Sequence, residues 1–162
     1  MSNLGLEVAL NNLNIPFFRT KVGDRFIIEA LKKNNWNLGG EASGHILCLD
    51  AHNTGDGIIS ALKVLAVICA TGRTLQDLKT DMEKYPQVMI NIKMLKRIDI
   101  LNNKRINHEV EYARNMLSEG GRVLLRLSGT EPLVRVMVEG RDFQQVNEIA
   151  KHLSEIVAAE IA

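Results

Sequence analysis

The sequence is poor in the residues that build disulfide-linked, metal-binding or membrane-spanning proteins. Its 162 residues include two cysteines, three prolines and only 4% aromatic residues. Cys48 and Cys69 are too far apart for a Cys-x-x-Cys motif and lie in apolar surroundings, so we expect two buried free thiols. No apolar run is long enough to span a bilayer, and the N-terminus lacks the pattern of a signal peptide. These absences favour a cytoplasmic soluble protein without a membrane partner.

An excess of charge of one sign is also missing. The formal net charge is +1, with nine basic and nine acidic residues in 1–84 and eleven and ten in 85–162. Proteins that bind nucleic acids usually carry a basic patch or stripe, so this balance argues against a nucleic-acid partner. The composition is instead 46% apolar and 24% charged, which is typical of a globular chain with one domain or two small ones.

The first half of the chain alternates helical and strand patterns. Apolar spacing predicts helices at 4–13, 24–33 and 58–70, strands at 17–22 and 46–49, and a capped helix from Thr74 to about residue 83. The helix at 58–70 is apolar on most sides, so we expect it to be well buried. The alternation indicates an α/β layered unit, but one that opens on a helix and offers few strands to cover 58–70.

The second half is predicted to form a separate domain, with the boundary at Tyr85-Pro86. Its strands are expected at 87–93, 122–126 and 133–139, and its helices at 107–118 and after Asp142. The polar segment 96–104 fits either a short strand or a helical turn. The inward residues of the two helices are predicted to be Val110, Ala113, Met116, Leu117, Phe143, Val146, Ile149, Ala150, Leu153, Ile156 and Val157. This order predicts an α+β domain with an antiparallel sheet and helices on one face.

The richest chemistry lies in the loop Arg126-Leu-Ser-Gly-Thr-Glu-Pro132 between two strands. Gly129 allows backbone turns that aim consecutive N–H groups into one hollow. Ser128 and Thr130 add hydroxyl donors, and the planar guanidinium of Arg126 suits a phosphate. An ordinary hairpin loop with a solvated arginine is the alternative, because small polar residues favour turns whatever their function.

A second candidate site is Gly40-Glu-Ala-Ser-Gly-His45. The carboxylate of Glu41, the hydroxyl of Ser43 and the imidazole of His45 can bind adjacent sugar hydroxyls in complementary donor and acceptor roles. A tight turn before strand 46–49 is the alternative reading.

Two weaker clusters complete the candidates. The basic turn 21–25 holds Lys21, Asp24 and Arg25, which are usually solvated in such a turn. Asp50, His52 and Asp56 resemble a metal cluster only superficially, because a metal site needs convergent ligands with supporting contacts. Asp56 is better explained as the partner of the helix dipole that follows it, so we expect no metal in this chain.

A family resemblance rests on the segment Gly121-Arg-Val-Leu-Leu-Arg-Leu-Ser-Gly-Thr-Glu-Pro-Leu-Val-Arg-Val-Met-Val-Glu-Gly140. It closely resembles the C-terminal phosphate-binding segment of bacterial phosphoglucosamine mutases, which belong to the α-D-phosphohexomutase superfamily. The resemblance implies that the phosphate of the sugar that is not reacting is held by Arg126, Ser128, Gly129 and Thr130. Leu127 stands where relatives often carry Lys or Pro. Arg135 is a further phosphate candidate, with a solvated strand arginine as the alternative.

The resemblance extends to the first half of the chain. Residues 40–45 are similar to the sugar-binding loop of phosphohexomutases, which implies that Glu41 and Ser43 contact hexose hydroxyls and that His45 supports them. Ala42 replaces the usual Gln, Asn or Met of that loop. Residues 21–25 are similar to a segment near the active cleft, so Lys21, Asp24 and Arg25 are candidates for contact with a substrate phosphate or an adjacent domain.

The resemblance also implies what the chain would lack. It assigns 1–84 to an incomplete sugar-binding domain 3 and 85–162 to a phosphate-binding domain 4, so we expect a C-terminal fragment. The family reaction uses a phosphoserine in domain 1, a magnesium loop of the form Asp-x-Asp-x-Asp in domain 2 and a 1,6-bisphosphate intermediate. Neither motif occurs in this sequence. The resemblance therefore implies no catalytic residue and no Mg²⁺ ligand here, and no turnover by the fragment alone.

The expected parent enzyme interconverts glucosamine 6-phosphate and glucosamine 1-phosphate, an early step toward amino-sugar precursors of peptidoglycan. Its expected partners are a hexosamine phosphate, the N-terminal domains of the same chain and a second copy in a homodimer. Two other functions stay open: a phosphomannomutase or phosphoglucomutase of the same superfamily, and a non-catalytic phosphate-binding interaction module.

Overall fold

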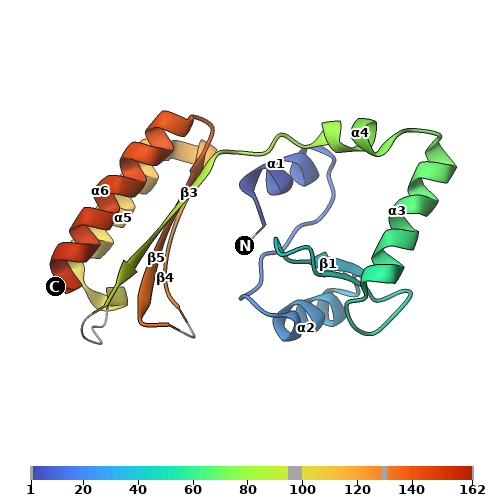
Figure 1. Ribbon diagram of the computed structural model, residues 1–162, viewed down its shortest axis with the longest axis horizontal. Coiled ribbons are helices and arrows are strands. Elements are labelled where there is room, and N and C mark those ends of the chain that lie inside the picture. Colours follow the sequence, from blue (N-terminus) through green and yellow to red (C-terminus); the bar gives the residue numbers. More distant parts are fainter. Residues whose placement is uncertain (1, 95–99, 129–130, 162) are drawn as a thin grey trace. The chain divides into compact units, whose positions relative to one another are not determined.

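The protein is described by a computed structural model that covers residues 2–94, 100–128 and 131–161 (Figure 1). Two compact units make up the chain, Met1–Glu83 and Lys84–Ala162. Within the described ranges, no helix combines the length and the apolar character that a membrane crossing requires.

The first unit consists mainly of helices around a short hairpin. Its elements are α1 (Leu4–Asn12), α2 (Asp24–Asn34), β1 (Leu38–Gly40), β2 (Ile46–Cys48), α3 (Gly57–Thr71), α4 (Leu75–Leu78) and a 3-10 turn at Lys79–Asp81. The strands β1 and β2 are antiparallel, with Gly40 opposite Ile46. A small core forms where Ile27 and Leu31 of α2 meet Leu47 of β2. A Cβ at Gly39 would lie 2.6 Å from the Ile27 side chain, so the missing side chain lets β1 lie against α2.

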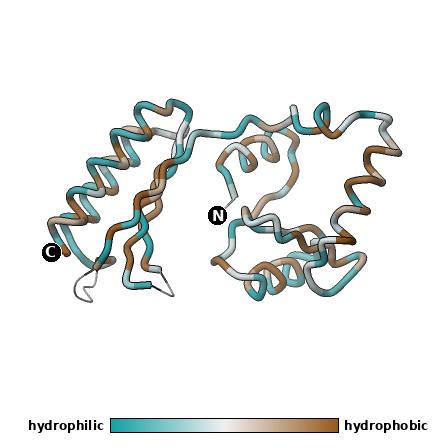
Figure 2. The backbone as a smooth tube through the Cα atoms, viewed as in Figure 1, coloured by the Kyte–Doolittle hydropathy of each residue, from teal (hydrophilic) through white to brown (hydrophobic). Residues whose placement is uncertain are grey.

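Some predictions for the first unit are wrong. Residues 17–22 form no strand, because no described segment of the unit lies beside them as a hydrogen-bonded neighbour. The helix α3 has no buried residue, and its Ile58 and Leu62 side chains are 74% and 59% exposed. Figure 2 shows how apolar this exposed helix is. Cys48 is buried as expected. Cys69 is exposed, because it lies on α3, which has no buried residue.

The start of α3 is fixed by Asp56, as the sequence predicts. Its carboxylate accepts hydrogen bonds from the backbone N–H groups of Ile58 and Ile59, at 2.8 and 3.0 Å. These two donors belong to the first turn, where a helix has no internal acceptors. The hydrogen bonds from Ile59 and Ile58 hold the pKa of Asp56 below its ordinary value.

The second unit is a three-stranded antiparallel sheet with two helices on one face. Its elements are β3 (Gln87–Lys93), a 3-10 turn (Ile100–Asn102), α5 (Lys104–Leu117), a 3-10 turn (Ser118–Gly120), β4 (Gly121–Leu127), β5 (Leu133–Gly140) and α6 (Phe143–Ile161). The strand order is β3-β5-β4, so β5 is central. This confirms the predicted α+β architecture of the second half.

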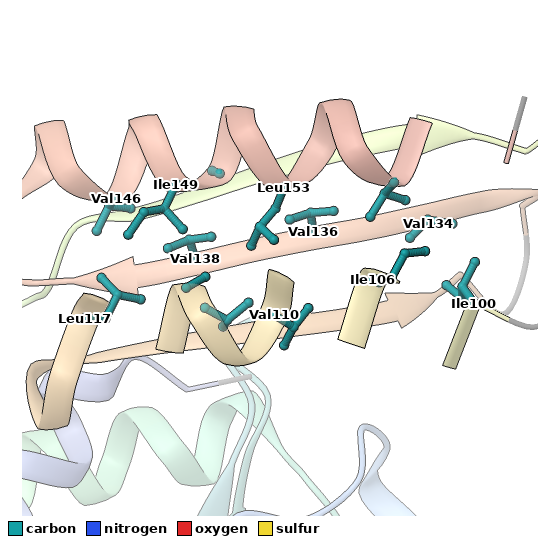
Figure 3. Close-up of a cluster of buried hydrophobic side chains, with 14 of the residues drawn as sticks. Ile100, Ile106, Val110, Leu117, Val134, Val136, Val138, Val146, Ile149 and Leu153 are labelled. Carbon is teal, nitrogen blue, oxygen red and sulfur yellow. The ribbon is translucent and has the colours of Figure 1, made fainter. Parts of the chain in front are cut away.

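The core of this unit lies between the sheet and its helices. Val134, Val136 and Val138 are fully buried and point from β5 toward side chains of α5 and α6 (Figure 3). Because successive side chains of a strand point to opposite faces, the residues between these valines lie on the other face of the sheet. Those alternating positions include Arg135.

Details of the predicted helices differ from the structure. Phe143 and Met116 were expected to point inward, but they are 63% and 47% exposed. Ile156 is only partly buried. The helix α5 begins three residues before its predicted start, because the Asn103 side chain accepts from the N–H groups of Arg105 and Ile106 and caps it there. Of the ambiguous segment 96–104, residues 96–99 lie outside the described residues and Ile100–Asn102 forms a 3-10 turn.

We expect Leu153→Ala to destabilise the second unit by about 2–5 kcal/mol, because it opens a cavity in a well-packed core. Leu153 is 1% exposed, whereas Phe143 on the same helix is 63% exposed. Phe143→Ala is therefore the matched control and should change the free energy of unfolding by much less. Urea unfolding followed by the amide NMR signals of α6 measures both. Equal losses for the two variants would contradict this core assignment.

The cap at Asp56 predicts a specific acid response. Since the folded-state pKa is lowered, the cap stabilises α3 above the unfolded-state pKa and is lost as the pH falls through the folded-state pKa. The amide proton shifts of Ile58 and Ile59 should titrate with a midpoint below about 3.9, the ordinary value for aspartate. Asp56→Asn retains a capping oxygen without this titration. A midpoint at or above the ordinary value would contradict the cap.

Candidate functional site

Two arginines face each other at the loop end of the β4–β5 hairpin. Arg126 and Arg135 are direct cross-strand partners, on the opposite face of β5 from its buried valines. The Nε atoms of both are buried and have no hydrogen-bond partner in the described part of the chain. Like charges directly opposite destabilise a sheet, and buried donors without acceptors cost free energy. An anion bound at this position would relieve both costs.

The polar groups of the loop gather at the same end. The Arg135 Nη2 atom lies 3.4 Å from Ser128 Oγ and 3.6 Å from the Glu131 carboxylate. The N–H of Ser128 donates to the Leu133 carbonyl at 2.8 Å, which closes the hairpin. The Pro132 carbonyl accepts from the N–H of Met94 at 2.9 Å and ties the loop to the end of β3.

The structure thus brings Arg126, Ser128 and Arg135 together at one end of the hairpin. Gly129 and Thr130, the other two predicted phosphate ligands, lie outside the described residues.

A third arginine on this face has a different environment. Arg122 Nη2 lies 2.8 Å from Glu139 Oε2, and the Glu139 side chain is fully buried. These two residues are also direct cross-strand partners. Sequence reasoning missed this ion pair, although alternation on both strands would have revealed it once the hairpin register was known.

The predicted sugar-binding residues lie in the loop that joins β1 to β2. The N–H of Glu41 donates to the His45 carbonyl at 2.9 Å, and the N–H of Gly44 donates to the Glu41 carbonyl at 3.0 Å. Gly44 has φ +90°, a conformation that residues with a side chain rarely adopt. The Ser43 side chain is exposed. The segment is therefore a tight hairpin turn that presents the Ser43 side chain outward.

This loop meets the beginning of α2. The N–H of Gly23 donates to Glu41 Oε1 at 3.0 Å, and His45 Nε2 lies 2.8 Å from Asp24 Oδ2. A Cβ at Gly55 would also overlap the Nε2 edge of the His45 imidazole, so the ring lies against the Gly55 backbone. Two candidate segments that are separate in the sequence, 21–25 and 41–45, therefore form one cluster.

The remaining candidates of the basic turn have other neighbours. The Lys21 ammonium lies 5.9 Å from the centroid of the Phe26 ring. Arg25 Nε pairs with Glu29 Oε1 at 2.8 Å on an exposed part of α2. Of the three predicted residues in this turn, Asp24 is the one with a polar contact to the loop 41–45 among the described residues.

The superficial metal cluster has other roles. Asp50 pairs with Lys63, and this hydrogen bond lowers the pKa of the Asp50 carboxyl. Asp56 caps α3, and His52 Nδ1 lies 3.4 Å from the Thr54 carbonyl. Across the described ranges, no group of three or more His, Cys, Asp or Glu side chains is placed to hold a metal ion.

The chain matches two descriptions of one protein family along most of its length. Residues 1–85 match the phosphoglucomutase/phosphomannomutase alpha/beta/alpha domain III, and residues 89–156 match the phosphoglucomutase/phosphomannomutase C-terminal domain.

Curated relatives and a solved structure agree with this match. The chain is 54% identical over 158 residues to a phosphoglucosamine mutase of Nitrosococcus oceani, covering 98% of this chain and 35% of that protein. It is 53% identical over 162 residues to a phosphoglucosamine mutase of Cellvibrio japonicus, covering 100% of this chain and 36% of that protein. It thus spans about a third of the length of these relatives.

The fold is similar to that of Aspergillus fumigatus N-acetylphosphoglucosamine mutase in complex with GlcNAc-6P and magnesium. The TM-score is 0.80 at 17% identity, covering 99% of this chain and 38% of that one. With both halves matched in order, the chain belongs to the phosphoglucomutase/phosphomannomutase family.

Proposed function

We propose that this chain is the substrate-binding part of a phosphoglucosamine mutase. In this proposal Arg126, Ser128, Gly129 and Thr130, with the help of Arg135, bind the phosphate of the sugar that is not reacting. The hairpin loop of the first unit binds the hexosamine through Glu41, Ser43 and His45. The phosphoglucosamine mutases that share about half of its residues support the choice of sugar.

The observation that carries the proposal is the arginine pair of β4 and β5. Two guanidiniums on directly opposed residues repel each other unless an anion lies between them. A phosphate accepts several hydrogen bonds at once and suits the planar fork of arginine. Their buried Nε atoms, which have no acceptor among the described residues, are donors that a phosphate could satisfy. The adjacent Ser128 hydroxyl adds a further donor.

The whole enzyme would interconvert glucosamine 6-phosphate and glucosamine 1-phosphate. Residues of this chain would bind and orient the sugar, which contributes positioning to phosphoryl transfer rather than a nucleophile. The described residues offer no fitting ligand set for magnesium. In this proposal, a phosphoserine and Mg²⁺ belong to other parts of the enzyme. A cytoplasmic location and a homodimer of the whole enzyme remain predictions.

Glucose and mannose phosphates are the competing substrates, because the matching family descriptions name phosphoglucomutase and phosphomannomutase. Competition among the three hexose 6-phosphates for the same protein would rank them. We expect glucosamine 6-phosphate to compete best.

Titration of the isotope-labelled chain tests both half-sites. Inorganic phosphate should shift the backbone amide signals of 126–130 and 135, because the anion is expected between these groups. Glucosamine 6-phosphate should shift the same signals and also those of 41–45. Glucosamine without phosphate is the control for the sugar alone. If millimolar phosphate leaves 126–135 unchanged while shifting other regions, the proposed phosphate site is wrong.

Arg135→Gln should change phosphate affinity much more than the free energy of unfolding. Removing one of two opposed charges relieves their repulsion but also removes the Arg135 contacts with Ser128 and Glu131, so the free energy of unfolding should change little. The substitution should weaken phosphate binding by about tenfold or more, since a hydrogen bond to a charged group contributes about 1.5–3 kcal/mol. The matched control is Arg114→Gln, because Arg114 pairs with Glu111 on the exposed side of α5. Calorimetry and urea unfolding measure the two effects. Equal phosphate affinity in both variants would contradict the assignment of Arg135.

A further inference from the structure

His45 is held by groups from two other segments of the first unit. Asp24 is the first residue of α2, and its Oδ2 lies 2.8 Å from His45 Nε2. Gly55 precedes α3, and its backbone occupies the place beside the ring where any Cβ would overlap the imidazole. Both contacts restrict the ring at its Nε2 edge, although 39% of the side chain remains exposed.

The residue before α2 also holds Glu41. The N–H of Gly23 donates to Glu41 Oε1 at 3.0 Å, one residue before Asp24. Glu41 and His45 are the first and last residues of the hairpin loop, and the loop is closed by the hydrogen bond from Glu41 N–H to the His45 carbonyl. Both ends of the loop are therefore anchored to residues 23 and 24, and the exposed Ser43 lies between them.

The contact with Asp24 determines which ring nitrogen carries the proton. A carboxylate oxygen and a bare imidazole nitrogen both carry lone pairs and would repel each other at 2.8 Å. The proton of the neutral ring therefore lies on Nε2, even though the carboxylate is off the line of an ideal hydrogen bond. Nδ1 is then left with a lone pair, and no described residue donates to it.

We propose that Asp24 is a positioning residue that, together with Gly55, fixes the His45 ring so that Nδ1 serves as a hydrogen-bond acceptor. Asp24 would not contact the substrate phosphate itself, where its negative charge would repel the ligand. Since the proposed function puts a hexosamine at this loop, Nδ1 would accept from a hydroxyl or ammonium group of the sugar. The remaining oxygen of Glu41 would accept from a neighbouring group, which makes the loop selective for donor groups.

The ring state can be measured in the ligand-free chain. At a pH where imidazoles are neutral, the ring nitrogen shifts of His45 should show one tautomer, with the proton on Nε2. Overhauser contacts should connect its ring protons with the α protons of Gly55. Asp24→Ala should give a mixture of tautomers and weaken these contacts. Glu29→Gln is the matched control, because it removes one carboxylate from the exposed side of the same helix. An unchanged ring in Asp24→Ala would overturn the proposal.

A second variant tests the contact between Gly55 and the His45 ring, with a separate check that the unit is folded. Gly55→Ala leaves all charges in place and has no left-handed backbone angle to strain it, but its methyl group would displace the ring from Asp24. It should also mix the tautomers, and amide signals of Leu47 and Leu31 report whether the small core is intact. A single Nε2–H tautomer in a folded Gly55→Ala chain would overturn the proposal.

Ligand binding then distinguishes this inference from the proposed function. Asp24→Ala should weaken glucosamine 6-phosphate by about three- to tenfold, the range of one hydrogen bond, and leave inorganic phosphate unaffected. Stronger binding of the sugar phosphate to Asp24→Ala would mean that Asp24 repels the phosphate and would overturn its positioning role. If the unchanged chain binds neither ligand but its His45 ring is fixed, the proposed function fails and the ring geometry stands.

Discussion

The register of the β4–β5 hairpin is the constraint on which the second unit depends. One register buries Val134, Val136 and Val138 under the helices and puts Arg135 opposite Arg126 on the other face. A shift by one residue would exchange the two faces and place arginines in the core. The apolar packing that stabilises the unit therefore also holds two like charges together. The fold accepts a local electrostatic cost at the place where an anion would remove it.

The first unit holds its polar loop by a different means. Among the described residues, its core cluster has Ile27, Leu31 and Leu47 as buried members, yet each end of the hairpin loop contacts the start of α2. A side-chain oxygen of Glu41 and a ring nitrogen of His45 are both engaged by neighbouring residues there. This leaves the other atoms of these side chains for a ligand. Few apolar contacts are needed when the hydrogen bond to Glu41 and the contact between Asp24 and His45 fix the direction of the side chains proposed to bind the sugar.

Sequence periodicity predicted most elements, and its failures have identifiable causes. The strand Gln87–Lys93 has its predicted bounds, because apolar and polar residues alternate along it and the less exposed face is the apolar one. Residues 17–22 have a strand pattern but no neighbour, and a strand exists only through its partner. Helix 58–70 was correctly predicted as a helix, but its apolar composition alone does not show whether other elements bury it. Both Ile58 and Cys69 are exposed. Asp24 and His45 are 21 positions apart in the sequence, so no motif could show that they touch.

The two candidate half-sites differ in how far their local geometry can account for binding. Each is built from contacts inside its own unit: Arg126, Ser128 and Arg135 by one hairpin, and Glu41 and His45 by another hairpin with α2. A phosphate satisfies charge and hydrogen bonds at the first half-site by itself, so its affinity there should depend little on the sugar. Hydroxyl and ammonium groups are already well hydrated, so the second half-site gains little from them unless the phosphate is also bound. Under the proposed function, the phosphate would supply most of the affinity, while the loop of the first unit would supply the selection among sugars.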